Sequence, residues 1–166
     1  MTHSLHREGP RDLLERDYVL FIFPARGFNY EGSEPKVRRL AELVYTQKPV
    51  NMVVTSLRRN LYSGVKPEEW FQSLKDGTKV YCVFTDREQL KKALARIKAM
   101  DEGISVVVSG LIDRVRDIAS EVGLNPHTII FLLESTGLQT GFLLRTSGNS
   151  PPCVATAWSL PAWSGT

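Results

Sequence analysis

Hydrophobic residues along this chain alternate between short continuous runs and longer segments in which they recur every three or four positions. The continuous runs predict strands over residues 18–23, 50–55, 78–85, 104–108 and 127–133. The periodic segments predict amphipathic helices over residues 35–47, 66–74, 86–100 and 111–122. The pattern therefore predicts five strands separated by four helices.

Polar residues, proline and glycine mark the ends of these helices. Ser33 and Asp86 are predicted N-caps, and Gln89 stands where a capping box would place it. Pro67 lies in the first turn of the second helix, where its missing N–H costs nothing. Gly123 is predicted to end the fourth helix as its C-cap.

Strands that are apolar at nearly every position favour a mostly parallel five-stranded sheet between layers of helices, which is an α/β fold. A helix separates each pair of consecutive strands, as the crossover of a parallel pair requires. An α+β arrangement of the ferredoxin-like type, which needs adjacent antiparallel strands, is the alternative.

The character of the chain changes after residue 130. The segment 131–166 keeps only Glu134 and Arg145 as charged residues, yet it holds Trp158 and Trp163, two of the three tryptophans. No helical or strand period continues after Leu133. These boundaries divide the chain into a flexible N-terminus (residues 1–16), an α/β domain (17–130) and a charge-poor, weakly ordered tail (131–166).

The tail can also be read in a shifted frame. With permitted third bases, the codons for residues 152–159 allow Met-Cys-Gly-His-Gly-Met-Val, a segment with a Cys-x-His pair. We therefore hypothesise that the residues from about 129 onward are a frameshift product. A naturally divergent tail is the alternative, and the coding DNA decides between the two.

Composition narrows the class of protein. With 42% hydrophobic and 23% charged residues in 166, the chain is typical of a soluble globular protein and can bury a core. The net charge of +3 is too mild to predict a nucleic-acid partner.

No apolar run approaches the ~20 residues that span a bilayer, so no membrane partner is predicted. The polar N-terminus lacks a signal-peptide core, so we expect a cytoplasmic protein in which Cys82 is a buried small hydrophobe.

Candidate chemistry lies at the ends of the predicted strands, because open parallel sheets bind ligands beyond their carboxyl ends. If the strands are parallel, Arg26, Arg58 and Ser109 share one rim, and two guanidiniums there suit a phosphate or a carboxylate. The alternative is that both arginines are solvated or paired with nearby acids. The candidate ligand-binding residues are Arg26, Gly27, Tyr30, Arg58, Ser109 and Gly110.

The loop after the first predicted strand has neither the Gly-Lys-Ser/Thr of a P-loop nor the glycine spacing of a dinucleotide site. It is either a flexible binding loop or a connection that needs positive φ at Gly27 and Gly32. The chain has no metal-spaced Cys/His cluster and no defensible catalytic triad. No metal, cofactor or catalytic residue is therefore assigned.

Four segments, residues 24–28, 79–86, 103–110 and 123–128, resemble an uncharacterised family of anaerobic prokaryotes. In intact members of that family a Cys-Gly-His-Gly-Met segment follows, which implies a metal or redox site. The resemblance covers residues 17–128, and the chain departs from the family pattern from about Ile129. None of those ligands is present here, so no metal-binding residue is carried over.

Three functional hypotheses follow. The first is the binding of a small anionic metabolite at the rim that holds Arg26 and Arg58. The second is a truncated metal- or redox-dependent enzyme that has lost its C-terminal Cys/His region. The third is a protein-interaction or assembly domain that self-associates through a free sheet edge or through the apolar tail.

Overall fold

The computed structural model describes residues 9–125, 128–131 and 153–158, with side chains described as far as residue 125. All five predicted strands and all four predicted helices are present, and their ends shift by only a few residues. One short helix, α1, and two strands, β3 and β7, are also present although the pattern did not predict them, and so is the 3-10 turn η1. In chain order the elements are α1 (Arg11–Leu14), β1 (Tyr18–Phe23), α2 (Glu34–Thr46), β2 (Asn51–Val54), β3 (Arg59–Asn60), η1 (Leu61–Ser63), α3 (Pro67–Gln72), β4 (Val80–Phe84), α4 (Arg87–Met100), β5 (Ser105–Leu111), α5 (Ile112–Glu121), β6 (Thr128–Phe131) and β7 (Cys153–Trp158).

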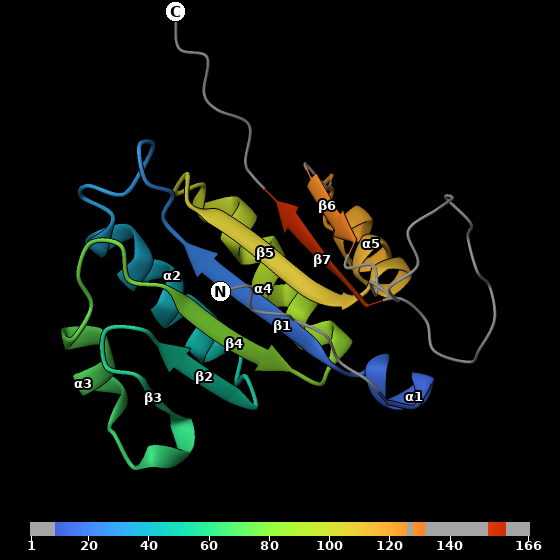
Figure 1. The fold of residues 1–166 in the computed structure, drawn as a ribbon, viewed down its shortest axis with the longest axis horizontal. Helices are drawn as coiled ribbons and strands as arrows, with labels where there is room; N and C mark the ends of the chain where they lie inside the picture. Colours follow the sequence, from blue (N-terminus) through green and yellow to red (C-terminus); the bar gives the residue numbers. More distant parts are fainter. Residues whose placement is uncertain (1–8, 126–127, 132–152, 159–166) are drawn as a thin grey trace, which may run out of the picture.

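The strands form one sheet in the order β3-β2-β4-β1-β5-β7-β6, and every neighbouring pair is antiparallel (Figure 1). The prediction of a mostly parallel α/β sheet was therefore wrong, and the architecture is α+β. Strands β1, β2, β4 and β5 follow a βαββαβ connectivity with the spatial order β5-β1-β4-β2. That is the split βαβ connectivity of the ferredoxin-like alternative.

The error has a topological cause. β1 and β2 do run in the same direction, as a helical crossover requires, because both are antiparallel to β4. β4, which comes later in the chain, lies between them and pairs with both. β4 and β5 enclose β1 in the same way. In these two pairs of strands the helical connection gives a common direction without making the strands neighbours. β2 and β4 differ, because they are antiparallel neighbours although α3 lies between them, and this reversal makes β5 antiparallel to β1.

The helices α2, α4 and α5 cover one face of the sheet (Figure 1). Burial alternates along the strands, so that Leu20 and Ile22 of β1 are fully buried while Phe21 and Phe23 are only half-buried. The same alternation holds in β4. The apolar strands therefore have one face in the core and one open face, instead of the two covered faces that a parallel sheet would have had.

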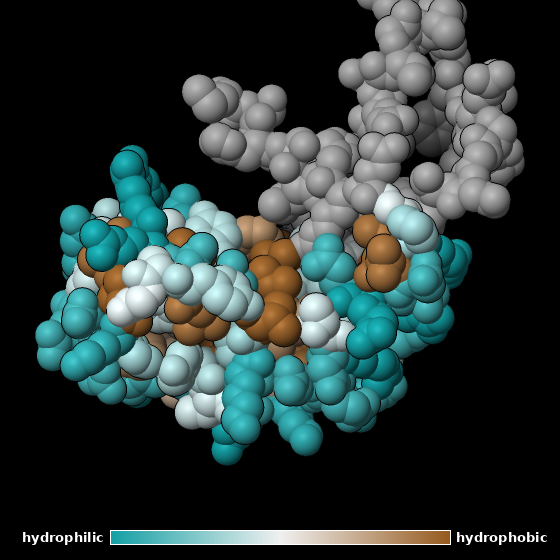
Figure 2. All heavy atoms as spheres, turned by 90° about the horizontal axis from the view of Figure 1, so that it is seen from below, coloured by the Kyte–Doolittle hydropathy of each residue, from teal (hydrophilic) through white to brown (hydrophobic). Residues whose placement is uncertain are grey.

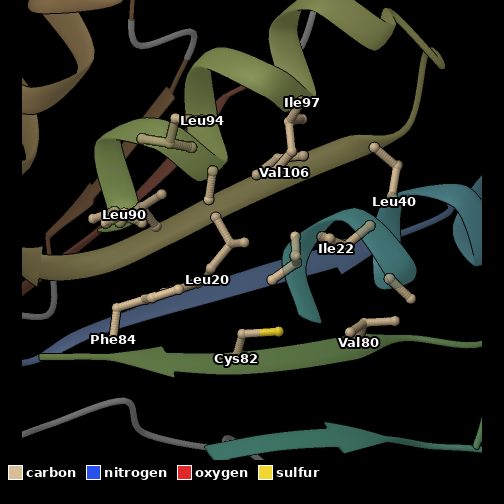
Figure 3. Packing of buried hydrophobic residues seen from close by; sticks show 14 of the residues in the cluster. Leu20, Ile22, Leu40, Val80, Cys82, Phe84, Leu90, Leu94, Ile97 and Val106 are labelled. Atoms are coloured by element: carbon tan, nitrogen blue, oxygen red, sulfur yellow. The ribbon is translucent and has the colours of Figure 1, made fainter. Parts of the chain in front are cut away.

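The core fills the space between this sheet and the helices. Leu20 and Phe84 project from β1 and β4 toward Leu90 and Leu94 of α4 (Figure 3). Each such buried side chain contributes about 1.5–3 kcal/mol relative to its exposed state. Cys82 is also fully buried, which confirms its predicted role as a small hydrophobic residue.

Strand β7 lies in the segment for which the sequence predicted no regular structure. It pairs with β5 on one side and with β6 on the other. His127, Trp163 and the side chains of Cys153 and Trp158 lie outside the described residues. The frameshift hypothesis and the truncated-enzyme hypothesis both concern this part of the chain, and they stay predictions.

The surface seen from below in Figure 2 is mostly hydrophilic, with hydrophobic areas between the polar side chains. Among the described residues, no helix has both the length and the apolar character that a bilayer crossing needs.

Candidate anion-binding site

Three loops meet at one end of the sheet. Because β1 and β2 run in the same direction, Ile22 near the end of β1 and Val54 at the end of β2 are both paired with Val80, the first residue of β4. The loop after β1 (residues 24–33), the turn after β2 (55–58) and the loop before β4 (75–79) therefore lie together. We call these three segments the rim.

Four of the six predicted site residues, Arg26, Gly27, Tyr30 and Arg58, belong to the rim. The prediction that these residues lie together required only that β1 and β2 run in the same direction. They do, because each of them is antiparallel to β4. Tyr30 and Arg58 line one open hollow of the rim, and Arg26 and Tyr30 line a second.

Ser109 and Gly110 do not belong to the rim. Both lie within β5, which is antiparallel to β1, so that Ser109 pairs with Val19 near the start of β1, at the other end of the sheet. Ser109 is only 2% exposed. A Cβ added to Gly110 would lie 3.0 Å from the Tyr18 ring, so its small size serves packing there. The prediction that Ser109 shares one rim with Arg26 and Arg58 assumed parallel strands, and it was wrong for that reason.

Tyr30 occupies the centre of the rim and rests on a glycine. A Cβ built on Gly77 would lie 2.1 Å from Cε2 of the Tyr30 ring, which only an unsubstituted residue allows. The guanidinium carbon of Arg26 lies 5.7 Å from the centroid of the same ring, within the range of a cation–π contact. The backbone of residue 77 and the side chain of residue 26 thus both help to place the phenol.

The loop before β4 is bound to the start of α2. The Asp76 carboxylate accepts hydrogen bonds from the backbone N–H of Glu34 (2.8 Å) and of Gly32 (2.9 Å). These two amides, that of Glu34 first, hold the pKa of Asp76 below its ordinary value. Ser33 stands at the predicted N-cap without a side-chain capping bond, and its Oγ accepts instead from Gly77 N–H at 3.0 Å. Asp76 therefore binds the first amide of α2, and the Ser33 hydroxyl joins the loop before β4 to the start of the same helix.

The loop after β1 is held at a second point. The Asn29 side-chain oxygen accepts from Ala25 N–H at 2.6 Å, and its amide nitrogen donates to the carbonyl of Gly103. Gly27 and Gly32 have φ values of 82° and 69°. Of the two interpretations of this loop, the connection that needs positive φ at both glycines agrees with the observed backbone.

The two hollows differ in their walls. The first, of about 230 Å³, is lined by Arg58 and Lys75 and by the residues Thr55, Ser56 and Thr78. The second, of about 350 Å³, is lined by Arg26 and Lys79 and by the apolar residues Phe23, Pro24 and Ala25. Tyr30 and Gly77 line both. The rim thus offers a polar compartment and a partly apolar one on the two sides of Tyr30.

The rim keeps an excess of positive charge. The rim holds four cations, which are named at the end of this paragraph. Within the described part of the chain none of them has an ion pair, whereas Arg39 pairs with Glu102 and Arg87 with Glu121. Asp76, the carboxylate that lines the first hollow, is bound to backbone amides. The four cations are Arg26, Arg58, Lys75 and Lys79.

Arg58 has an unusual backbone. Its φ is 55°, and its N–H donates to Val54 O at 3.0 Å in the turn that joins β2 to β3. Left-handed backbone costs a non-glycine residue about 1–2 kcal/mol. Such outliers gather at functional sites, where the surrounding structure holds the residue in its strained conformation. The other non-glycine residues with positive φ among those described, Lys48 and Asp101, follow helices and lie outside the rim.

Sequence reasoning missed Gly77, Asp76 and Lys79. The Asp-Gly pair at 76–77 is a local turn signal. That signal locates a turn, but it contains no information about the partners of these residues, which lie more than forty positions earlier in the chain.

A metal or thiol site finds no support among the described residues. No group of three or more His, Cys, Asp or Glu side chains lies close enough to hold a metal ion there. Burial raises the pKa of the Cys82 thiol, which disfavours the reactive thiolate.

Comparisons of the chain with protein-family models, with curated proteins and with solved structures each find no match. The resemblance of residues 17–128 to a family of anaerobic prokaryotes therefore stays a prediction.

Proposed function

We propose that this chain binds a small anionic ligand at the rim. The observation that carries the proposal is the convergence of four cations from three loops around Tyr30, without an ion pair to any described residue. The Asp76 carboxylate stays charged but binds two amides and pairs with none of the four cations; with Glu31 counted as well, the rim has four cations and two carboxylates, a net charge of +2. An anion from solution would supply the missing negative charge.

The hydroxyl groups of the first hollow support a phosphate or carboxylate ligand. Thr55 Oγ1 accepts from Lys79 N–H at 2.9 Å, and Thr78 Oγ1 accepts from Lys75 N–H at 3.1 Å. A hydroxyl that accepts from the backbone still has its own O–H to donate. These two donors, together with the Arg58 guanidinium and the Lys75 ammonium, suit the several acceptor oxygens of an anion.

Thermal unfolding in the presence of inorganic phosphate or pyrophosphate tests the proposal. A ligand at a hundred times its Kd stabilises the folded state by about 2.7 kcal/mol. We expect both anions to raise the melting temperature of the natural chain at constant ionic strength, and Arg58→Gln to reduce that rise. Arg96→Gln is the matched control, because Arg96 is exposed on α4 and donates only to Thr46 Oγ1 in the described structure.

Two outcomes would count against anion binding. One is the absence of any stabilisation by either anion beyond that of chloride. The other is an equal response in the Arg58→Gln and Arg96→Gln variants, which would mean that the anions act through the overall charge of the protein and not through the rim.

Self-association through the open face of the sheet is a second candidate function. This face includes Val19, Phe21, Tyr81 and Val83, which are half-buried, and the rings of Phe21 and Tyr81 meet edge to face at 4.9 Å. No charged side chain stands at an open-face position of β1, β2 or β4. A second copy related by a two-fold axis would therefore meet apolar groups without like-charge repulsion.

Light scattering over a range of protein concentrations tests this second function. If the open face is an interface, Val83→Lys should shift the chain toward the monomer, since two copies would place lysines in an apolar contact. Arg96→Gln serves again as the control on the helical side. A natural chain that stays monomeric at high concentration would exclude self-association under those conditions.

A further inference from the structure

We propose that the ligand of the rim is an anion that carries an aromatic ring, of the chemical class of the nucleoside monophosphates. The anionic group would occupy the first hollow and the ring the second. This inference rests on the proposed function, because it names the ligand class of the same site. It follows from the contrast between the two hollows and from the position of Tyr30 between them.

The first hollow is suited to the anionic group alone. Its walls supply hydroxyls, two cations, Arg58 and Lys75, and one carboxylate, Asp76, which accepts hydrogen bonds from two backbone amides. Tyr30 also lines the second hollow. At about 230 Å³ it lies below the ~300 Å³ at which small-molecule pockets usually begin. It therefore fits one part of a ligand better than a whole metabolite.

The second hollow has the walls of a ring-binding compartment. Phe23 and Pro24 give it an apolar side, and the Arg26 guanidinium stands over the Tyr30 ring. Flat groups such as phenyl rings and guanidiniums favour a flat aromatic partner over a branched aliphatic one. Its volume of about 350 Å³ is the larger of the two, as the larger part of the ligand requires.

Tyr30 connects the two compartments at a fixed position. It lines both hollows, and Gly77 beneath it does so too. The hydrogen bonds of Asp76 and Ser33 hold the Gly77 backbone against the start of α2. A ligand that reaches both hollows must therefore pass the phenol ring, whose place is set before binding. That preorganisation reduces the entropic cost of binding a two-part ligand.

Calorimetric titration of the full chain with three probes tests this inference. The probes are inorganic phosphate, adenosine and adenosine monophosphate, which carry the anion alone, the ring alone and both. We expect the monophosphate to bind between about fivefold and about 150-fold more tightly than phosphate, which is the range that one stacked base contributes. Adenosine should bind more weakly than the monophosphate, because it leaves the cations of the first hollow without an anion.

Two phenylalanines provide a matched pair of variants. Phe23→Leu removes an aromatic wall of the second hollow, whereas Phe28→Leu changes a residue that is 92% exposed and lines neither hollow. Phe23→Leu should lower the affinity for the monophosphate toward that for phosphate and leave phosphate binding unchanged. Phe28→Leu should change neither. Arg26→Gln gives a second test at an exposed residue, and it should weaken the binding of the monophosphate more than that of phosphate.

The outcomes separate this inference from the function on which it rests. If phosphate binds and Arg58→Gln weakens it, but the monophosphate binds no more tightly than phosphate, the rim binds anions and the ring-binding inference is wrong. If Phe23→Leu weakens phosphate and the monophosphate equally, the second hollow does not hold the ring. If neither anion binds the natural chain, the proposed function and this inference fail together.

Discussion

The phenol ring of Tyr30 lies so close to Gly77 that a Cβ on residue 77 would collide with it at 2.1 Å. Gly77→Ala should therefore destabilise the fold by about 1–3 kcal/mol, as an overpacked contact does. The variant should also displace Tyr30 and weaken anion binding. Urea denaturation measures the first effect and phosphate titration the second.

Gly64→Ala is the control for this prediction. Gly64 has a φ of 72°, close to the 77° of Gly77, but an added Cβ at position 64 would meet nothing within 4 Å. Both variants share the cost of a left-handed alanine, so their difference reports the collision with Tyr30. If the two lose the same stability, the ring does not rest on Gly77 in solution.

Replacing Arg58 should affect stability and ligand binding in opposite directions. Arg58→Gly relieves the positive φ of 55° and removes the guanidinium from the first hollow. The free energy of unfolding should stay equal or rise by up to about 1 kcal/mol, because the relief of strain exceeds the entropic cost of glycine. Phosphate affinity should fall. Lys48→Gly, at a φ of 54° outside the rim, should give a similar change in stability with phosphate affinity unchanged.

Trp70 should tolerate a change to phenylalanine. The side chain is fully buried, and its indole Nε1 has no hydrogen-bond partner in the described structure. Trp70→Phe removes that unsatisfied donor, which offsets part of the lost packing, so the cost should stay below about 1.5 kcal/mol. Trp70→Ala should cost about 3–5 kcal/mol because it leaves a cavity. Similar losses in the two variants, measured by urea denaturation, would show that the indole N–H does have a partner.

Asp76 should make stability depend on pH. The amides of Glu34 and Gly32 lower its pKa in the folded state, so its stabilising effect is present above the ordinary carboxyl pKa of about 3.9. That effect is lost as the pH falls through the lower folded pKa. The difference in unfolding free energy between the natural chain and Asp76→Asn should therefore shrink between neutral pH and strongly acidic pH. A difference in unfolding free energy that stays constant over that pH range would contradict the hydrogen bonds between the charged Asp76 carboxylate and the two backbone amides.

The local elements of this fold are readable from the sequence, but the order of the strands is not. Tyr18–Phe23 is a continuous apolar run, and the strand has those same ends, because β-propensity and apolar runs act over neighbouring residues. The place of β4 between β1 and β2 depends on contacts between segments that are distant in the sequence. The periodicity of hydrophobic residues contains no information about such contacts. β1 and β2, joined by α2, run in the same direction, so Arg26 and Arg58 lie at one end of the sheet as predicted. The chain reverses between β2 and β4 although α3 lies between them, so β5 is antiparallel to β1 and Ser109 lies at the other end.

Single residues of the rim also show that local sequence patterns do not reveal contacts between distant segments. The glycines at positions 27 and 32 predict a backbone with positive φ, and both residues have a positive φ in the structure. The site also needs the pairing of Asp76 with the amides of residues 32 and 34, for which no local pattern exists. Arg58 is harder still to predict, since arginine carries no preference for the left-handed backbone that it adopts here.

The central position of β1 has a consequence for the growing chain on the ribosome. β1 is translated before its two neighbours, and its Phe21 pairs with Tyr81 on one side and with Val107 on the other. Both edges of this apolar strand therefore lack their partners until translation has passed residue 84, and one edge still lacks its partner until β5 emerges. Unpaired strand edges promote aggregation of nascent chains. Stalled translation products that end between β1 and β4 should accordingly need a chaperone to stay dispersed.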